Sequence, residues 1–270
     1  MDTINFSFWN EKSSKYVVTY KGIPYNGYFA ACACVNRAID EGIPLLNAEF
    51  MKSITVDNVK EIFKSDSGSP IPLVEERVKV ISEAGRILEE KFNGTFYSCI
   101  ENCNRSAVEL LKIVTNNFES YRDYAEYKGQ KVSFLKRAQI LVADIYNSCK
   151  EKIRLADFSD IGQLTMFADY RVPQSLCFLG ALEYSPVLKK ILCEGTLDNG
   201  SEIEVELRGF SIFVCDEVTA MIRYLRTPAD ANLQVINAID VDVFLWFYRR
   251  KYACEVEEKI PYHKTRCIYY

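Results

Sequence analysis

Histidines and paired cysteines are scarce in this sequence of 270 residues, and their scarcity excludes several kinds of site. His263 is the single histidine, and the ten cysteines are scattered, with Cys32 and Cys34 or Cys99 and Cys103 as nearest neighbours and no Cys-x-x-Cys pair. A zinc site needs paired thiolates or several histidines at ligand spacing, so we expect no metal. Most cysteines should be reduced residues of the core, including Cys32 and Cys34. Carboxylates, lysines and tyrosines are left for catalysis.

The sequence also lacks the marks of a secreted, membrane or nucleic-acid-binding protein. Its net charge is −4, and it has no basic tail of the kind that follows a phosphate backbone. Residues 1–5 (MDTIN) show neither the basic nor the apolar part of a signal peptide, and no apolar run approaches the roughly 20 residues of a membrane helix. We expect a cytoplasmic monomer that binds a small molecule, with no cofactor, membrane or duplex nucleic acid as a partner.

Apolar and aromatic residues are abundant. Hydrophobic residues make up 49% of the chain, with 17 Tyr and 16 Phe, which suffices for a core and for the walls of a pocket for a flat ligand. Residues 15–20 (KYVVTY), the break at Lys21-Gly22 and residues 23–25 (IPY) predict a short β-hairpin near the N-terminus. We find no other convincing strand region. The sequence therefore predicts a mainly α fold in a single helical domain that spans residues 1–270.

Apolar residues at three- and four-residue steps predict a series of helices, and capping residues and prolines mark their ends. The helices are expected from Gly27 to a stop at Gly42 and Pro44, from Pro72 to about 92–94, after a capping box at 106–109, from a cap at Ser133 to about Cys149, from Ser159 to about Ala168, from Pro173 onward, from about 202 to 225, and from about 230 to 252. Residues 65–72 (SDSGSPIP) should form a loop.

Asp169 lies at the break between two of these helices, just before Val172-Pro173. Its carboxylate can point toward the free N–H groups at the start of the next helix. That position suits a fixed carboxylate in an active site. It also suits an acid that only caps or links two helices, and the spacing alone does not decide between them.

Four cations surround the start of the helix that is expected after Ser133. They are Lys128, Lys131, Lys136 and Arg137. Positive charge at the N-terminal end of a helix is unfavourable because it opposes the helix dipole, and a bound anion would offset that cost. The cluster can therefore hold a phosphate. The alternative is that these long side chains simply extend into water.

Asp242 and Trp246 are four residues apart on one predicted helix, so an acid and an indole can meet the same ligand. The alternative is that this aromatic stripe belongs to the core. The aromatic cluster at residues 5–9 (NFSFW) is equally consistent with packing.

Several strings together resemble the queuosine-salvage protein family, the queuosine 5′-phosphate N-glycosylases. The resemblance runs from Ile4 to Tyr270, and the string at 167–174 is long and specific. It is carried by residues 5–9 (NFSFW), Gly27-Tyr28, 36–44 (NRAIDEGIP), 75–77 (EER), 131–139 (KVSFLKRAQ), 167–174 (FADYRVPQ) and 266–270 (RCIYY).

The resemblance implies an α-helical fold related to helix-hairpin-helix DNA glycosylases. It also implies hydrolysis of queuosine 5′-monophosphate to ribose 5-phosphate and queuine, which is then available for tRNA modification. The catalytic aspartate of the family falls on Asp169, and an acid that contacts the base falls on Asp242. The substrate contacts that we then expect are Phe167, Ala168, Tyr170, Asp242 and Trp246, with Lys136 as a phosphate ligand from the dipole argument.

The chemistry agrees with these assignments. Breaking the bond between ribose C1′ and the base nitrogen builds positive charge on the sugar, and a fixed carboxylate such as Asp169 can stabilise that charge or attack C1′. A 7-deazaguanine leaving group lacks the N7 that glycosylases often protonate. More of the work then falls on the carboxylate and on hydrogen bonds to the base.

Two departures from the family pattern are visible. Members commonly have a further helical region before residues 5–9, so we expect an N-terminal region that is short for the family. Phe247 stands where the family often has an acid. Two alternative functions stay open, the first because the fold relationship allows it and the second because of the short N-terminal region. One is a lesion glycosylase that acts on nucleic acid, which the net charge disfavours, and the other is a non-catalytic protein that binds a modified nucleotide.

Overall fold

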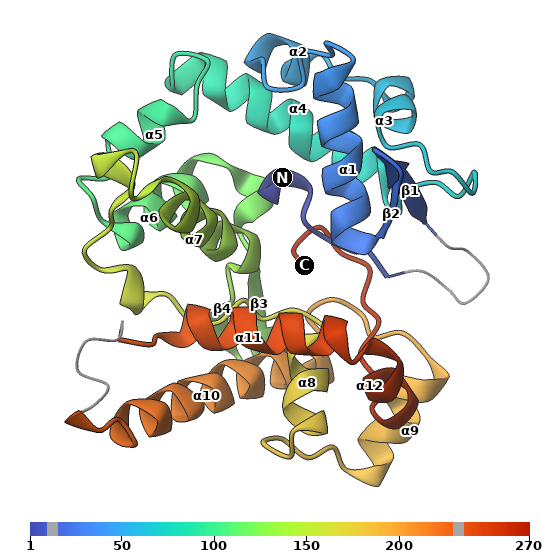
Figure 1. Ribbon diagram of the computed structural model, residues 1–270, viewed down its shortest axis with the longest axis vertical. Helices are drawn as coiled ribbons and strands as arrows, with labels where there is room; N and C mark the ends of the chain where they lie inside the picture. Colours follow the sequence, from blue (N-terminus) through green and yellow to red (C-terminus); the bar gives the residue numbers. More distant parts are fainter. Residues whose placement is uncertain (10–15, 229–234) are drawn as a thin grey trace. The chain divides into compact units, whose positions relative to one another are not determined.

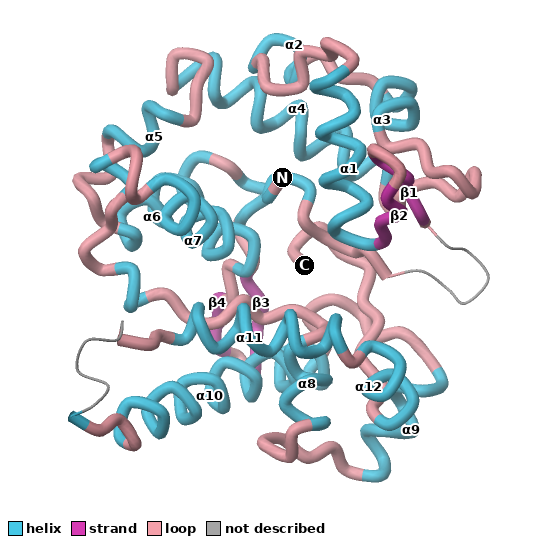
Figure 2. The backbone as a smooth tube through the Cα atoms, in the orientation of Figure 1, coloured by secondary structure: helices cyan, strands magenta, loops and turns pink. Residues whose placement is uncertain are grey.

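The structure is a computed structural model, and it describes residues 1–9, 16–228 and 235–270 of the chain. Helices dominate it (Figure 1), and Figure 2 shows the strands of the described residues as two small antiparallel hairpins. The prediction of a mainly α fold with a hairpin near the N-terminus is confirmed. The chain divides into two compact units: a first unit of Met1–Arg105, Glu109–Arg122 and Cys267–Tyr269, and a second unit of Ser106–Val108, Asp123–Arg266 and Tyr270.

The first unit is built from helices and one hairpin around a core of its own. The first two residues of its last α-helix, α6, belong to the second unit. Its elements are η1 (Asp2–Ile4), β1 (Val17–Tyr20), β2 (Ile23–Asn26), α1 (Gly27–Asp40), α2 (Ala48–Lys52), α3 (Val56–Ile62), α4 (Val74–Lys91), α5 (Tyr97–Glu101), α6 (Ala107–Asn117) and η2 (Glu119–Tyr121).

The second unit packs three helices, α8, α10 and α11, around a second core. This core includes Val172 and Leu176 of α8, Val205 and Cys215 of α10, and Leu245 of α11. The elements of the unit are β3 (Tyr124–Tyr127), β4 (Gln130–Ser133), α7 (Lys136–Cys149), η3 (Arg154–Ala156), η4 (Ile161–Gln163), α8 (Val172–Phe178), α9 (Pro186–Glu194), α10 (Glu202–Tyr224), α11 (Ala238–Lys251) and α12 (Ala253–Lys259).

Both hairpins turn on a Lys-Gly pair. Lys21 and Gly22 have φ angles of 49° and 79°, and Lys128 and Gly129 have φ angles of 51° and 77°. Two successive residues with positive φ form the two-residue turn that matches the twist of a hairpin. In each case the lysine Nζ lies 4.8 Å from the ring centroid of the preceding tyrosine. The second hairpin, β3–β4, was not predicted, although the same Tyr-Lys-Gly string marks it.

Most of the predicted helices are confirmed, with small shifts at their ends. The prediction from Gly27 corresponds to α1, the prediction from Pro72 to α4, the prediction after 106–109 to α6, the prediction from Pro173 to α8, and the prediction for 202–225 to α10. Residues 65–72 form the expected loop. The helix start at Ala107 is capped from a distance, since the Asp160 carboxylate accepts from the N–H groups of Ala107 at 2.6 Å and Val108 at 3.3 Å.

The predicted cap at Ser133 is wrong, although the helix does end at Cys149. Ser133 closes strand β4, and α7 begins at Lys136 after Leu135 in a left-handed conformation. The carboxylate of Asp123, distant in sequence, accepts from the Lys136 N–H at 3.0 Å. Asp123 thus caps α7 in place of Ser133.

The predicted helix from Ser159 to Ala168 is also wrong. This region holds only the short turn η4, and residues 164–169 have no regular secondary structure. Side chains from other elements bind its backbone instead. The helix expected from about 230 begins at Ala238, where Asn237 and Asp240 form a capping box. The part of that prediction on residues 229–234 lies outside the described residues.

Arg77 on α4 fastens the N-terminal string in the first unit. Its guanidinium is buried and donates to the carbonyl oxygens of Ile4 at 2.6 Å, Phe6 at 2.7 Å and Pro72 at 2.8 Å. The group lies 4.3 Å from the ring centroid of Phe6 and 5.1 Å from that of Phe8. The packing interpretation of residues 5–9 is therefore confirmed for Phe6, which is 1% exposed.

None of the helices in the described residues is both long enough and apolar enough to span a bilayer. All ten cysteines are free thiols, and Cys34 is fully buried, as expected, whereas Cys32 is only partly buried.

Replacing Arg77 by Leu should lower the free energy of unfolding by about 3 kcal/mol or more. The carbonyl oxygens of Ile4, Phe6 and Pro72 each lose a donor, and only the Ile4 oxygen is shown to keep another one, the Phe6 N–H at 3.0 Å. A buried acceptor left without a partner costs about 1–3 kcal/mol. Arg86→Gln is the matched control, since Arg86 is an exposed arginine of the same helix paired with Glu90, and its loss should cost less than about 1 kcal/mol. Urea unfolding of both variants tests the expectation, and equal losses would contradict it.

Candidate active site

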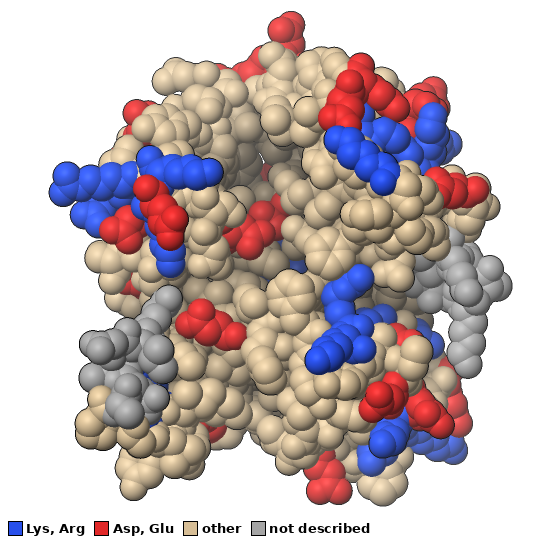
Figure 3. Space-filling model, in the orientation of Figure 1, with Lys and Arg blue, Asp and Glu red and all other residues tan. Residues whose placement is uncertain are grey.

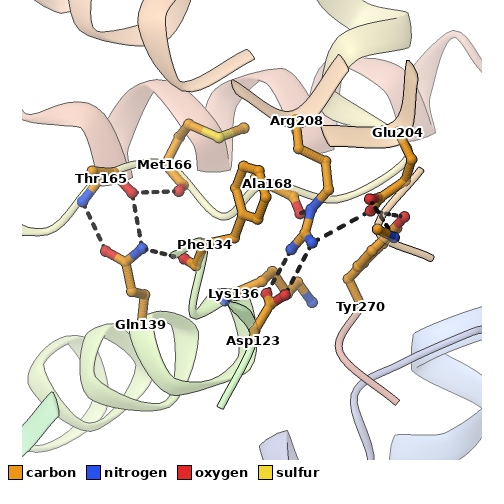
Figure 4. A network of polar contacts seen from close by, with 11 residues as sticks. Asp123, Phe134, Lys136, Gln139, Thr165, Met166, Ala168, Glu204, Arg208 and Tyr270 are labelled. Carbon is orange, nitrogen blue, oxygen red and sulfur yellow. Dashed lines mark hydrogen bonds and ion pairs between the residues drawn. The ribbon is translucent and has the colours of Figure 1, made fainter. Parts of the chain in front are cut away.

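The segment at residues 165–169 is held in place by side chains from other elements of the second unit. Gln139 of α7 binds its beginning (Figure 4): the Gln139 Nε2 donates to Thr165 Oγ1 at 2.8 Å and to the Phe134 carbonyl at 2.9 Å, and its Oε1 accepts from the Thr165 N–H at 2.9 Å. One amide therefore ties this segment to the start of α7. Backbone groups that lack a helix or sheet partner are satisfied in this way.

Arg208 of α10 binds the same segment at Ala168. Its Nε donates to the Ala168 carbonyl at 2.9 Å, while Nη1 and Nη2 donate to the two oxygens of Asp123 at 3.0 and 2.5 Å (Figure 4). Glu204 lies 3.4 Å from Nη1 and accepts from the Tyr270 hydroxyl at 2.6 Å. Arg208 is 1% exposed, and its pair with Asp123 is bidentate, which is the strong form of such contacts.

Two aromatic rings lie close to this guanidinium. The Arg208 Cζ lies 4.0 Å from the Phe134 ring centroid and 4.2 Å from that of Tyr270. Burial lowers the pKa of Arg208, but the charge and hydrogen bonds of Asp123 outweigh that effect and raise it overall. Arg208 is therefore a permanent cation fixed within the core of the second unit.

Asp242 of α11 binds the segment at Phe167. Its Oδ1 accepts from the Phe167 N–H at 3.0 Å, and the side chain is 5% exposed. Burial and the nearby charge of Asp169 raise the pKa of Asp242 well above its usual range, and the Phe167 hydrogen bond and the Lys136 charge offset only part of this. Burial and the Asp169 charge thus shift the balance of Asp242 toward the protonated carboxyl, which can donate a hydrogen bond.

Asp169 ends the segment and caps α8. Its Oδ1 accepts from the N–H groups of Arg171 at 2.7 Å and Val172 at 2.9 Å, so the expected contact with the next helix start is confirmed. Within the described part of the chain, Oδ2 makes no hydrogen bond. The carboxylate is thus oriented through one oxygen while the other is available.

Tyr170 lies against other aromatic rings beside Asp169. Its ring centroid is 5.7 Å from that of Tyr262 and 6.4 Å from that of Tyr270, and burial raises the pKa of its hydroxyl to about 12. Phe167 and Ala168 are buried as well, whereas Trp246 is partly buried, with the Arg250 guanidinium 5.2 Å from its ring centroid.

The structure brings only some of the predicted site residues together. Asp169, Asp242 and Lys136 lie within electrostatic range of one another in the second unit. The four-cation cluster does not form as expected. Lys128 and Lys131 are exposed on the hairpin β3–β4, where Lys131 lies 3.8 Å from the Tyr124 ring centroid, whereas Lys136 and Arg137 are buried at the start of α7. The cap that Asp123 supplies to α7 removes the dipole conflict on which that prediction rested.

Four residues of the polar network around residues 165–169 were missed from the sequence: Asp123, Gln139, Glu204 and Arg208. One indication was present, because Glu204 and Arg208 are four residues apart on the face of α10 that also carries the buried Val205 and Leu207. Charged residues on an apolar helical face are almost never buried unless they are paired. Asp123 and Gln139 left no such pattern.

His263 is fully buried and stays neutral. Burial, together with the charges of Arg208 and Arg171, lowers its pKa to about 3. Its ring contacts Tyr270 edge-on at 5.7 Å, and neither ring nitrogen has a hydrogen-bond partner in the described residues. Across the described part of the chain, His, Cys, Asp and Glu form no group that could hold a metal ion.

Comparison with known proteins gives matches along the whole of this chain. The family model described as queuosine salvage protein matches residues 1–270. A relative from Mus musculus is 45% identical over 274 residues, covering 100% of this chain and 80% of the relative. Relatives from Bos taurus and Sphaerobacter thermophilus are 44% and 40% identical, with 100% of this chain and 79% of each relative covered. All three are named queuosine 5′-phosphate N-glycosylase/hydrolase.

The pKa of His263 predicts a pH-dependent stability term. The unfolded chain takes up a proton near pH 6.5, whereas the folded protein does so only near pH 3, so lowering the pH favours the unfolded state across this window. The term is absent above about pH 6.5 and approaches about 1.4 kcal/mol per pH unit below it.

The measurement is the free energy of unfolding of the wild type minus that of His263→Gln, taken between about pH 7 and about pH 5. This difference removes the opposing titration of Asp242, which both proteins share. It should fall as the pH is lowered, and a difference that stays constant would contradict the expectation.

Proposed function

The chain belongs to the queuosine salvage protein family, and we propose that it hydrolyses the N-glycosidic bond of queuosine 5′-monophosphate. Water adds to ribose C1′, and the products are ribose 5-phosphate and queuine, which can be salvaged for tRNA modification. The observation that carries the proposal is the similarity along the whole chain, at 40–45% identity, to relatives named for this activity. Asp169 and Asp242 in the second unit supply the carboxyl groups that this hydrolysis needs.

Asp169 is the proposed catalytic carboxylate. Its Oδ1 is held by two backbone N–H groups, and its Oδ2 makes no hydrogen bond within the described residues. A carboxylate fixed in this way stabilises the positive charge that develops on the sugar without having to reorganise during the reaction. The same geometry allows direct attack on C1′.

Asp242 is the proposed acid on the base side. A protonated carboxyl can donate a hydrogen bond to the departing base, and this helps a 7-deazaguanine that has no N7 to protonate. Burial and the neighbouring Asp169 favour that protonated form. Where two carboxyl groups share one enzyme site, they commonly take different roles, one as acid and one as nucleophile or charge stabiliser.

The remaining predicted contacts are proposed to line the substrate. Phe167 and Ala168 are held through their backbone by Asp242 and Arg208, so their positions are fixed relative to both acids. Tyr170 and Trp246 offer aromatic surfaces, and Lys136 carries positive charge near Asp242.

The names of the relatives favour this enzyme over the two alternatives, a lesion glycosylase and a non-catalytic binding protein. Two further points stay predictions: residues 1–270 act as one functional domain, and the fold is related to that of DNA glycosylases. A cytoplasmic location, a monomeric state and the absence of a nucleic-acid partner also stay predictions.

Asp169→Asn should lower the rate of base release from queuosine 5′-monophosphate by about 100-fold or more, in line with the loss of an electrostatic contact to a transition state. The amide oxygen still accepts the two N–H bonds that cap α8, so folding is preserved. Release of the free base is followed by mass spectrometry.

The matched control is Asp160→Asn. Asp160 is likewise a carboxylate that accepts two N–H bonds at a helix start in the second unit, and its loss should leave the rate unchanged. Equal rates for the wild type and Asp169→Asn would remove Asp169 from the mechanism. Binding of the nucleotide without release of base by the wild type would favour the binding-protein alternative.

The protonated form of Asp242 predicts an alkaline limit of activity. As the pH rises through the raised pKa of Asp242, the carboxyl loses the proton that it donates to the base, so kcat/KM should fall. Asp242→Asn keeps an acceptor for the Phe167 N–H but cannot titrate. Its activity should be lower overall and should lack this alkaline limb, and the same limb in both pH profiles would contradict the assignment.

A further inference from the structure

Two arginines of the second unit share the same pair of acceptor oxygens. Arg171 Nη1 lies 3.0 Å from Glu257 Oε1 and 3.2 Å from Gln174 Oε1. Arg249 of α11 pairs with the same Glu257 oxygen through Nη2, and its Nε lies 3.4 Å from the same Gln174 oxygen. Gln174 is itself fixed, since its Nε2 donates to the Ile260 carbonyl at 2.7 Å. Two like charges are therefore held side by side.

The charges of this cluster do not balance. The side chains of Arg171 and Arg249 are 16% and 11% exposed, and the one carboxylate that they share, Glu257, is 48% exposed. Burial and the charge of Arg171 lower the pKa of Arg249 to about 10, and the same two causes lower the pKa of Arg250. Mutual repulsion of this kind disfavours the arrangement, and a bound anion would relieve it.

The two guanidinium groups are also held in fixed positions. The Arg171 Cζ lies 3.9 Å from the Tyr262 ring centroid and 5.3 Å from that of Tyr170. A planar guanidinium that is already oriented loses little freedom when it binds the oxygens of a phosphate, which it can contact through two N–H groups at once. Lys136 offers only a single ammonium.

The cluster of Arg171 and Arg249 lies at a distance from Asp169 and Asp242 that suits the phosphate end of a nucleotide. Arg171 follows Asp169 by two residues, and its N–H donates to the Asp169 carboxylate. On α11, Asp242, Trp246 and Arg249 follow one another at helical spacing, which sets Asp242 and Arg249 about 10 Å apart along the axis. That span is comparable to the length of a mononucleotide from base to phosphate. Basic side chains gather over this end of α11 in Figure 3.

We propose that Arg171 and Arg249 bind the 5′-phosphate of the substrate, and that Glu257 holds the two guanidinium groups together until the phosphate displaces it. This inference rests on the proposed function, and it moves the phosphate contact from Lys136 to the cluster of Arg171 and Arg249.

The first test compares queuosine 5′-monophosphate with the nucleoside queuosine as substrates. Arg249→Gln should lower kcat/KM on the monophosphate about 10- to 100-fold more than on the nucleoside, the loss expected for one charge-assisted contact. Lys251→Gln is the matched control, because it removes the same charge from an exposed residue of the same helix end. It should leave the ratio of the two kcat/KM values unchanged.

The second test looks for tighter binding of a phosphate ligand, a result that a folding defect would not produce. Glu257 competes with phosphate for both arginines, so Glu257→Gln should strengthen inhibition by ribose 5-phosphate several-fold while inhibition by ribose stays the same. Isothermal calorimetry with ribose 5-phosphate gives the same comparison without turnover. Unchanged or weaker binding of ribose 5-phosphate to Glu257→Gln would overturn the proposal.

The outcomes separate this inference from the function on which it rests. Equal losses on both substrates in Arg249→Gln, with a phosphate-selective loss in Lys136→Gln, would overturn the inference and leave the hydrolase intact. If the wild type releases base from neither substrate, the hydrolase fails, and tighter binding of ribose 5-phosphate to Glu257→Gln would still support the phosphate site.

Discussion

The buried guanidinium of Arg208 is the contact on which the geometry of the candidate site depends. A buried charge is costly unless carboxylates and further acceptors surround it, and here Asp123, Glu204 and the Ala168 carbonyl do so. Because the Ala168 carbonyl belongs to the residue just before Asp169, the position of the proposed catalytic carboxylate is fixed from within the core of the second unit. Asp123 extends the same network to the start of α7 through the Lys136 N–H.

The chain at residues 165–169 can be irregular because side chains from three helices replace the hydrogen bonds of a helix or sheet. Gln139 binds Thr165, Asp242 binds the Phe167 N–H and Arg208 binds the Ala168 carbonyl. An irregular segment between rigid supports lets one residue be aimed precisely, which a regular helix over 159–168 would not allow. Asp242 therefore has two roles in this arrangement: its Oδ1 is a structural hydrogen-bond acceptor, and its carboxyl group is the proposed acid.

The sequence predicted those parts of the fold whose causes are local. Apolar periodicity and Pro72 predicted α4, and the Val172-Pro173 break predicted both α8 and the capping contact of Asp169. The predictions failed where a distant residue decides the local structure. Asp123 rather than Ser133 caps α7, and Gln139, Arg208 and Asp242 override the helical pattern before Asp169. The proximity of Asp169 and Asp242 was expected only from the family resemblance, since neither residue carries any local mark of the other.

The helix α11 relates the two ends of the proposed site to each other. Its buried face carries Asp242 beside Asp169, in surroundings that favour a protonated carboxyl, and two turns later it carries Arg249 beside Arg171, in surroundings with excess positive charge. Asp169 and Arg171 are joined by the hydrogen bond at the start of α8. The acid end and the cationic end are therefore fixed by the same two elements, so a ligand with a hydrogen-bonding base at one end and a dianionic phosphate at the other matches both ends in one orientation only. A nucleoside without its phosphate would match the acid end alone.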